Sequence, residues 1–305
     1  MNAAPAVSIA IRAFRRTWLD AAIASVLGQT WRDLELIVYD DAGDLEDVVA
    51  RFDDPRVRYV RAEQKLEASG RFAAAVALCR GRTIGLLDDD DRYEPAFIER
   101  LAEALDSDPR AGAAFCRDRD VSMGRRRPRR RSLGPPGRQQ DVLRRMFTER
   151  WVVAPSSMLL RREALEDIEP MPDGVSPDVF LAFHLAHAGW HHVLVDDVLV
   201  VRRWHDANLS RTIVVANYMV ATLERLQTAD SELETLRRRE LVRRILVRAA
   251  FRLVEGDRRN ALADVRAARE TDPSAHHALR SLVQLAAALP LLGPLAARIA
   301  RALRA

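Results

Sequence analysis

Cysteine and lysine are both scarce in this sequence of 305 residues. The two cysteines, Cys79 and Cys116, are isolated and lack the close spacing of metal-binding pairs. This excludes a disulfide framework and indicates reduced core residues of a cytosolic protein. Lys65 is the only lysine, so arginine carries almost all of the positive charge. The formal net charge of +4 is a mild excess that favours anionic partners such as nucleotides, phosphorylated acceptors or anionic membrane surfaces.

Long apolar runs and a secretion signal are also lacking. The longest apolar tract, Leu282–Ala297, is interrupted by Gln284, Pro290, Gly293 and Pro294, whereas a membrane-spanning helix needs about 20 consecutive apolar residues. The N-terminal segment shows no basic region followed by an apolar stretch and a cleavage site. We therefore expect a cytoplasmic protein, with peripheral contact to the inner face of the membrane as an open alternative.

The composition is that of a globular protein, because hydrophobic residues make up 48% of the chain and charged residues 30%. In the first 116 residues, strand-like apolar runs alternate with segments of helical spacing. The strand-like runs are Val7–Ile11, Leu34–Tyr39, Val57–Val60, Thr83–Leu87 and Ala111–Cys116, and the helical segments are Trp18–Leu27, Leu45–Phe52, Arg71–Cys79 and Pro95–Leu105. This alternation predicts an α/β fold with a mostly parallel sheet flanked by helices.

The segment Arg125–Arg131 holds six arginines and precedes a Gly-Pro-Pro-Gly sequence, so it is predicted to be an exposed loop. It suits an anionic membrane or an acceptor phosphate, whereas nucleic acid is disfavoured because no aromatic residues are interleaved with the arginines. Regular structure is predicted to resume at Val142–Phe147, Ser156–Leu160, a helix Val179–Ala188 and a strand Val193–Val201.

From Thr212 the spacing becomes helical, over Tyr218–Leu226, Leu233–Val254 and Asn260–Arg269. We expect residues 1–211 to form the main domain and residues 212–305 to form a helical C-terminal region. The stretch Ala249–Pro273 is similar to one tetratricopeptide-like helix pair, but a single copy is better interpreted as general helix packing. The last helix, with Leu295, Ile299 and Leu303 on one face, suits either a membrane surface or a cap on the other helices.

Two acidic clusters end strand-like runs. Four consecutive aspartates, Asp88–Asp91, follow one run, and the pair Asp40-Asp41 ends another. In parallel α/β sheets ligands bind beyond the carboxyl ends of the strands, so both clusters are expected to face one crevice. Carboxylates packed this densely repel one another unless a divalent cation or a hydrogen-bonding ligand relieves the repulsion. The pattern therefore predicts a site for a metal ion and a nucleotide.

From Val7 to about Ser210 the chain resembles the family 2 glycosyltransferases, which are inverting enzymes of the GT-A fold. The resemblance rests on several motifs that occur in the family's order. They are Val7–Ile11, Ser25-Val26-Leu27-Gly28-Gln29-Thr30, Leu36–Asp41, Gly81-Arg82-Thr83-Ile84, Asp88–Asp91 with Tyr93 and Pro95, and Asp178 before a helix that ends in Gly189-Trp190. The resemblance implies a donor half at about 1–116 and an acceptor half at about 117–211.

The resemblance assigns roles to the acidic clusters. Asp41 is expected to hold the nucleotide base, although it also suits a turn or a helix cap. The family's D-x-D spacing falls on Asp88 and Asp90, with Asp90 as the direct ligand of Mn²⁺ or Mg²⁺ and Asp88 or Asp89 facing the ribose. A solvated acidic turn is the alternative for this cluster.

Asp178 matches the family's general base, which takes a proton from the acceptor hydroxyl, and capping of the following helix is its alternative role. The glutamate that precedes this aspartate in the family is Pro177 here. His205 lies where the family often places a histidine near the diphosphate, and we count it with the metal site. A zinc site is also conceivable at four histidines, His184, His187, His191 and His192, but no set of cysteines or carboxylates completes such a site.

Two motifs depart from the family. Its first-strand motif is replaced by Arg12–Arg16, and its small-Arg-Asn segment by Ser69–Ala73. Arg12 and Arg71 are expected to replace the missing contacts, because guanidinium groups clamp phosphates. A different donor or a loss of activity would also explain these departures.

The resemblance implies an enzyme that moves a sugar from a nucleoside-diphosphate sugar to a hydroxyl of a glycan, glycolipid or other acceptor, in the synthesis of bacterial surface glycans. A sugar-1-phosphate nucleotidyltransferase is disfavoured because its glycine-rich N-terminal loop is absent. The alternative outside the enzymes is a catalytically silent protein of the same fold, which docks partners through its arginine loop and helical tail.

Overall fold

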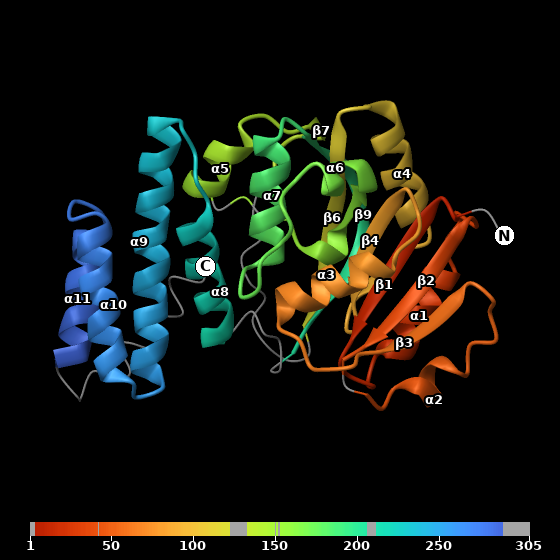
Figure 1. Ribbon diagram of the computed structural model, residues 1–305, viewed down its shortest axis with the longest axis horizontal. Helices are drawn as coiled ribbons and strands as arrows, with labels where there is room; N and C mark the ends of the chain where they lie inside the picture. Colours follow the sequence, from red (N-terminus) through yellow and green to blue (C-terminus); the bar gives the residue numbers. More distant parts are fainter. Residues whose placement is uncertain are drawn as a thin grey trace.

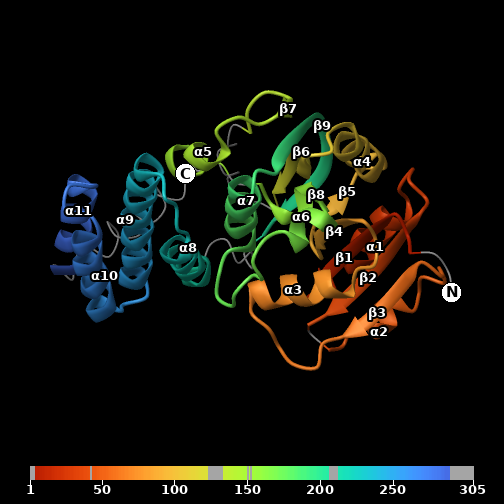
Figure 2. The ribbon, with the colours of Figure 1, turned by 45° about the horizontal axis from the view of Figure 1, so that its top comes forward.

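A nine-stranded sheet with helices on both faces forms the main body, and a group of helices extends from one end (Figures 1 and 2). The computed structural model describes residues 4–41, 43–122, 133–149, 151, 153–205 and 212–288. The arginine segment Arg125–Arg131 and the last helix with Leu295, Ile299 and Leu303 lie outside the described residues. The strand order is β3-β2-β1-β4-β8-β6-β9-β5, with β7 paired to β9. This mixed, mostly parallel sheet between helices is the predicted α/β fold.

The N-terminal half alternates strands and helices as predicted. Its elements are β1 (Val7–Ala13), α1 (Leu19–Leu27), β2 (Leu34–Asp40), α2 (Glu46–Val49), β3 (Val57–Arg61), α3 (Ala68–Leu78), β4 (Thr83–Asp88), β5 (Arg92–Tyr93), α4 (Phe97–Ser107) and β6 (Ala111–Ser122). Strand β1 lies between β2 and β4 and is parallel to both.

Helices cover both faces of these strands because side chains alternate between the faces. All seven residues of β2 are buried. Leu36 and Val38 belong to the core shared with α1 and α4, whereas Ile37 and Tyr39 belong to the core shared with α3. This burial on both faces explains why β2 is an almost continuous apolar run.

The second half of the sheet is mixed, and β6 and β9 are longer than predicted. Its elements are β7 (Gly137–Arg138), α5 (Val142–Thr148), the 3₁₀ turn η1 (Pro155–Ser157), β8 (Met158–Arg161), α6 (Arg162–Glu166), α7 (Pro177–His187) and β9 (His191–Trp204). Strand β8 is antiparallel to β4 and β6. Strand β6 does not end at Cys116 as predicted, because it pairs with β9 as far as Ser122 and Trp204.

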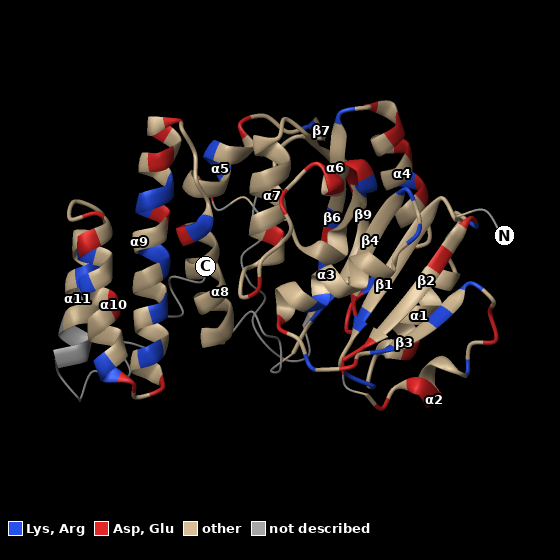
Figure 3. Cartoon of the chain, viewed as in Figure 1, with Lys and Arg blue, Asp and Glu red and all other residues tan. Residues whose placement is uncertain are grey.

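The C-terminal helices pack against the main body. They are α8 (Ile213–Arg225), α9 (Ser231–Val254), α10 (Arg258–Thr271) and α11 (His277–Ala288). Their apolar residues continue the core that contains α5 and α7. Helix α9 carries both acidic and basic side chains (Figure 3), and its buried Glu240 pairs with Arg243 and Arg244. Among the described helices, none combines the length and the apolar composition that crossing a membrane requires.

Candidate active site

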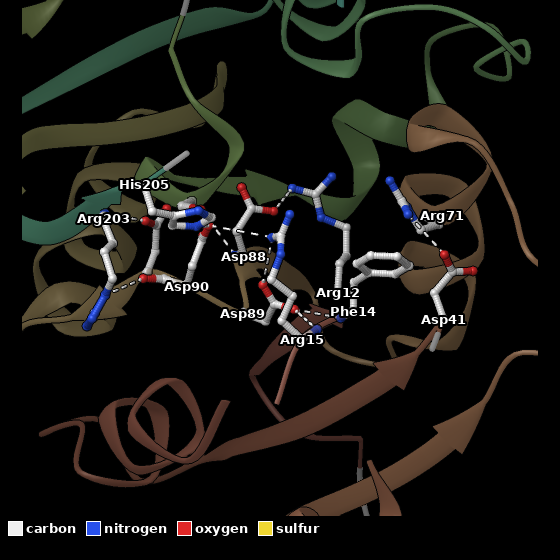
Figure 4. A network of polar contacts seen from close by, with 12 residues as sticks. Arg12, Phe14, Arg15, Asp41, Arg71, Asp88, Asp89, Asp90, Arg203 and His205 are labelled. Carbon is white, nitrogen blue, oxygen red and sulfur yellow. Dashed lines mark hydrogen bonds and ion pairs between the residues drawn. The ribbon is translucent and has the colours of Figure 1, made fainter. Parts of the chain in front are cut away.

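The carboxyl ends of β1, β2 and β4 bring both acidic clusters together, as Figure 4 shows. Arg12 lies between the clusters, because its backbone pairs with Tyr39 on one side and with Asp88 on the other. Its guanidinium forms an ion pair with the Asp88 carboxylate. The buried Nε of Arg12 has no hydrogen-bond partner within the described part of the chain. The two clusters therefore share an edge that contains a partly unsatisfied guanidinium.

The two aspartates at the end of β2 have different surroundings. Asp40 is fully buried and accepts hydrogen bonds from the backbone N–H groups of Gly43 and Leu45 and from the Tyr59 hydroxyl, at 2.7, 3.0 and 2.6 Å. These bonds stabilise the turn after β2. Asp41 instead accepts hydrogen bonds from Arg71 at 2.9 Å and from the Leu66 N–H at 3.2 Å.

A pocket of about 580 Å³ opens beside Asp41. Phe14 is 40% exposed there. The charged groups of Lys65, Arg15 and Arg71 lie 5.1, 5.7 and 6.0 Å from the centre of the Phe14 ring. Cations at this distance are attracted to the face of an aromatic ring. The pocket thus combines an aromatic face, positive charge and a carboxylate acceptor, which suits a nucleotide. Phe14 was not predicted as a site residue from the sequence, although it lies within the altered first-strand motif Arg12–Arg16.

The four aspartates at the end of β4 point in different directions. Asp89 accepts hydrogen bonds from the backbone N–H groups of Phe14 and Arg15, at 2.6 and 2.5 Å. It therefore holds the end of β1 in place. Oδ2 of Asp90 lies 2.8 Å from Nε2 of His205.

Asp91, which the sequence reasoning did not assign, accepts a hydrogen bond of 3.0 Å from the backbone N–H of Arg203. Asp88, Asp90 and Asp91 each offer a carboxylate oxygen, and these three oxygens lie within 4.8 Å of one another. Hard oxygen donors at this spacing fit Mn²⁺ or Mg²⁺. Among the described residues, this is the one group of metal-ligating side chains, and it includes none of the four histidines that invite a zinc reading.

The electrostatics of the cluster favour a cation. Burial raises the pKa of Asp89, Asp90 and Asp91, and the charge of Asp88 raises each of them further. Arg15 acts in the opposite direction on Asp89 and Asp90, with its guanidinium 3.9 Å from both carboxylates. A bound divalent cation would favour the charged carboxylates, because opposite charge offsets the cost of removing them from water.

Asp178 lies in the first turn of α7, apart from these contacts. Its described hydrogen bonds are with the Ser176 hydroxyl and with the Val179 N–H, the latter at 3.0 Å. Asp178 also lines a small, mostly apolar cavity of about 10 Å³. The loop before α7 contacts the start of α3, because the Gly174 N–H donates to the Ser69 hydroxyl at 2.9 Å. This contact brings the segment preceding Asp178 to the helix that carries Arg71.

A family model described as glycosyl transferase family 2 matches residues 8–169, which is more than half of the chain. The chain belongs to glycosyl transferase family 2. This confirms the resemblance found in the sequence, and the matched segment contains both acidic clusters. Asp178 and His205 lie beyond the segment that matches the family 2 model.

Curated relatives of this family 2 chain match shorter segments. The succinoglycan biosynthesis protein ExoO of Rhizobium meliloti (strain 1021) is 35% identical over 99 residues, which cover 32% of this chain and 28% of that protein. The Escherichia coli UDP-Glc:alpha-D-GlcNAc-diphosphoundecaprenol beta-1,3-glucosyltransferase WfaP is 32% identical over 105 residues, which cover 33% of this chain and 42% of that protein. The chain thus spans less than half the length of these relatives.

Solved structures match the family 2 chain over nearly its whole length. The structure of Staphylococcus aureus TarS 1–349 in complex with UDP-GlcNAc superimposes with a TM-score of 0.67 at 16% identity, covering 98% of this chain and 91% of that one. The mannosyltransferase PcManGT from Pyrobaculum calidifontis, in complex with GDP-Man and Mn²⁺, gives a TM-score of 0.61 at 19% identity, covering 99% and 85%. At these identities the match establishes the fold, which is the predicted GT-A type.

Proposed function

We propose that this protein is a metal-dependent, inverting glycosyltransferase that moves a sugar from a nucleoside-diphosphate sugar to an acceptor hydroxyl. The observation that carries the proposal is the position of the pocket beside Asp41, at the same sheet edge as the Asp88–Asp91 cluster. A nucleoside diphosphate has a base at one end and negatively charged phosphates at the other. The site offers a carboxylate for the base and a cation-binding cluster for the phosphates.

For the donor, we assign the base to Asp41 and the diphosphate to Arg12 and Arg71. A carboxylate accepts a hydrogen bond from the imide N–H of uracil, thymine or guanine. Arg12 and Arg71 approach from opposite sides of Phe14 (Figure 4), and guanidinium groups bind phosphate oxygens in a bidentate manner. The ribose contact falls to Asp88, since Asp89 already accepts two backbone hydrogen bonds.

For the metal, we assign Asp88, Asp90 and Asp91 as the carboxylates that hold Mn²⁺ or Mg²⁺, with His205 beside Asp90. A divalent cation held there would neutralise negative charge on the leaving diphosphate. The neighbour PcManGT was solved with Mn²⁺ and GDP-Man, which supports the assignment of a divalent cation to this fold.

For the chemistry, we assign the general base to Asp178. Its carboxylate takes the proton of the acceptor hydroxyl while that oxygen forms a bond to the anomeric carbon of the sugar. The bond from this carbon to the diphosphate oxygen breaks with its electrons on the leaving group. Because attack and departure occur on opposite faces, the configuration at the anomeric carbon inverts.

For the biological setting, we propose the synthesis of a bacterial surface glycan or glycolipid at the cytoplasmic side of the membrane. The names of ExoO and WfaP, which concern succinoglycan biosynthesis and a diphosphoundecaprenol acceptor, support this class of acceptor. Peripheral contact with the membrane is part of this proposal.

Calorimetric titration of UDP, dTDP and GDP, with and without Mn²⁺, tests the donor site. The wild type is compared with Asp41→Asn and Asp90→Asn. The matched control is Asp197→Asn, because Asp197 is half exposed and its described ion pair is with Arg100. We expect one nucleotide to bind in a Mn²⁺-dependent manner, with both site variants weakened and the control unchanged. A folded wild type that binds none of the three nucleotides would refute the transferase assignment and favour the partner-docking alternative.

A further inference from the structure

His205 and Arg203 reach the acidic cluster together. Residues 203 and 205 are two apart at the end of β9, so their side chains leave the chain on the same side, as in an extended strand. Arg203 donates a hydrogen bond from Nε to the Asp90 carbonyl at 3.3 Å, and Nε2 of His205 lies 2.8 Å from the Asp90 carboxylate. Figure 4 shows both side chains beside Asp90. Trp204 faces elsewhere, because its Nε1 donates to Asp120 of β6 at 2.7 Å.

The indole of Trp18 contacts both of these side chains. The ring centroids of Trp18 and His205 are 4.8 Å apart, with an angle of 31° between the ring planes. The guanidinium carbon of Arg203 lies 4.9 Å from the centre of the Trp18 ring. Trp18 itself is anchored by the fold, since it is the N-cap residue of α1 and the following Leu19 is fully buried. An aromatic side chain at the start of the first helix thus meets the end of the last strand.

We propose that Trp18 is a positioning residue of the metal site, which holds the imidazole of His205 and the guanidinium of Arg203 against the aspartates. This role rests on the proposed metal-dependent function. His205 is the residue directly after β9, and its ring packs against the indole of Trp18. The contact with Trp18 limits the rotamers of His205 before the ion binds. The entropy lost on ordering the His205 side chain is then lost during folding and not during metal binding.

Titration of the full chain with Mn²⁺ alone tests this role. Binding is measured by electron paramagnetic resonance, as the loss of the signal of the free ion. The variants are Trp18→Leu, Trp18→Phe, His205→Ala and the double variant Trp18→Leu/His205→Ala. The matched control is Trp31→Leu, because the Trp31 indole donates to the Asp33 carbonyl at 3.1 Å, at the start of β2. Urea unfolding of each variant establishes that it is folded.

We expect Trp18→Leu to weaken Mn²⁺ binding about three- to tenfold, the effect of losing one aromatic and one cation–π contact. Trp18→Phe retains an aromatic face, so it is expected to bind within about twofold of the wild type. In the His205→Ala background, Trp18→Leu is expected to cause a smaller additional loss than in the wild type, because only the contact with Arg203 remains to be removed. The control is expected to match the wild type.

The outcomes separate this inference from the function on which it rests. If the wild type takes up no Mn²⁺, the proposed metal site fails, and the role of Trp18 fails with it. If the wild type binds Mn²⁺ and Trp18→Leu binds it equally well, the role of Trp18 alone is refuted. A full additional loss in the His205→Ala background would also refute it, because such a loss would be independent of His205.

Discussion

The guanidinium of Arg71 donates a hydrogen bond of 2.9 Å to Oδ2 of Asp41, and both side chains are largely buried. Arg71 comes from α3 and Asp41 from the end of β2, so this ion pair joins a helix to the sheet edge. It also covers the carboxylate that we assign to base recognition. A donor nucleotide must therefore compete with Arg71 or share Asp41 with it.

Loss of this ion pair is expected to destabilise the protein. Arg71→Met leaves the Asp41 carboxylate buried without its charged partner, so the free energy of unfolding is expected to fall by about 1–3 kcal/mol. The same change in an Asp41→Asn background is expected to cost less, because asparagine carries no charge. Urea unfolding of the wild type, both single variants and the double variant measures the coupling. Equal losses in both backgrounds would show that the two residues are not coupled.

The neighbouring aspartates Asp40 and Asp41 are expected to respond differently to the same substitution. Asp40→Ala leaves the N–H groups of Gly43 and Leu45 and the Tyr59 hydroxyl without their acceptor, and is expected to lower the free energy of unfolding by about 1–3 kcal/mol. Asp41→Ala is expected to weaken nucleotide binding more strongly than Asp40→Ala does. Urea unfolding measures the stability of both variants, and calorimetry measures their nucleotide affinity. If folded Asp40→Ala lost nucleotide affinity and Asp41→Ala did not, this prediction would be wrong.

Asp91 is expected to be needed for metal binding, although the sequence reasoning assigned the ion to Asp90. Asp91→Asn replaces one of the three carboxylates with an amide, and is expected to weaken Mn²⁺ binding by about 10- to 100-fold. Glu94→Gln serves as the control, since Glu94 pairs with Arg119 and is not part of the group. Paramagnetic resonance of free Mn²⁺ measures both, and equal affinities for Asp91→Asn and the wild type would remove Asp91 from the site.

His192 is expected to make the folded state sensitive to acid. Burial lowers the pKa of His192 to about 4, and its Nδ1 has no partner among the described residues. Between pH 6.5 and 4 the unfolded chain binds this proton and the folded chain does not, so stability falls as the pH falls. The loss from this residue is about 2 kcal/mol at pH 5. Urea unfolding measures the free energy of unfolding at pH 7.5 and at pH 5. The difference between the two pH values is expected to be smaller for His192→Gln than for the wild type, and equal differences would contradict this prediction.

Both cysteines are expected to be unreactive in the folded protein. Cys79 and Cys116 are buried and free, and burial raises the pKa of Cys79 to about 12 and that of Cys116 further. The thiolate is the reactive form, so Ellman's reagent is expected to label neither residue in native protein and both in urea. Rapid labelling without denaturant would show that one of them is accessible.

The sequence by itself determined the alternation of strands and helices in the N-terminal half and the position of both acidic clusters. The strands could be predicted because strands buried on both faces are nearly continuous apolar runs. The position of the clusters could be predicted because the carboxyl ends of parallel strands meet at one edge of the sheet. The long β6 and β9 were underestimated, since their outer halves carry charged residues that pair across strands, such as Asp118 with Arg202. The composition of each segment alone does not predict which charged residues pair across the strands.

Only the tertiary structure decided what each aspartate of the two clusters contacts. The resemblance to the family singled out Asp41 and Asp90, but the contacts of Asp40 and Asp89 did not follow from the sequence. The fold turns Asp40 toward its own loop and Asp89 toward the end of β1. It also brings His205 to Asp90, 115 residues away in the chain. Contacts between distant segments depend on how helices and strands pack, and no local pattern of residues determines them.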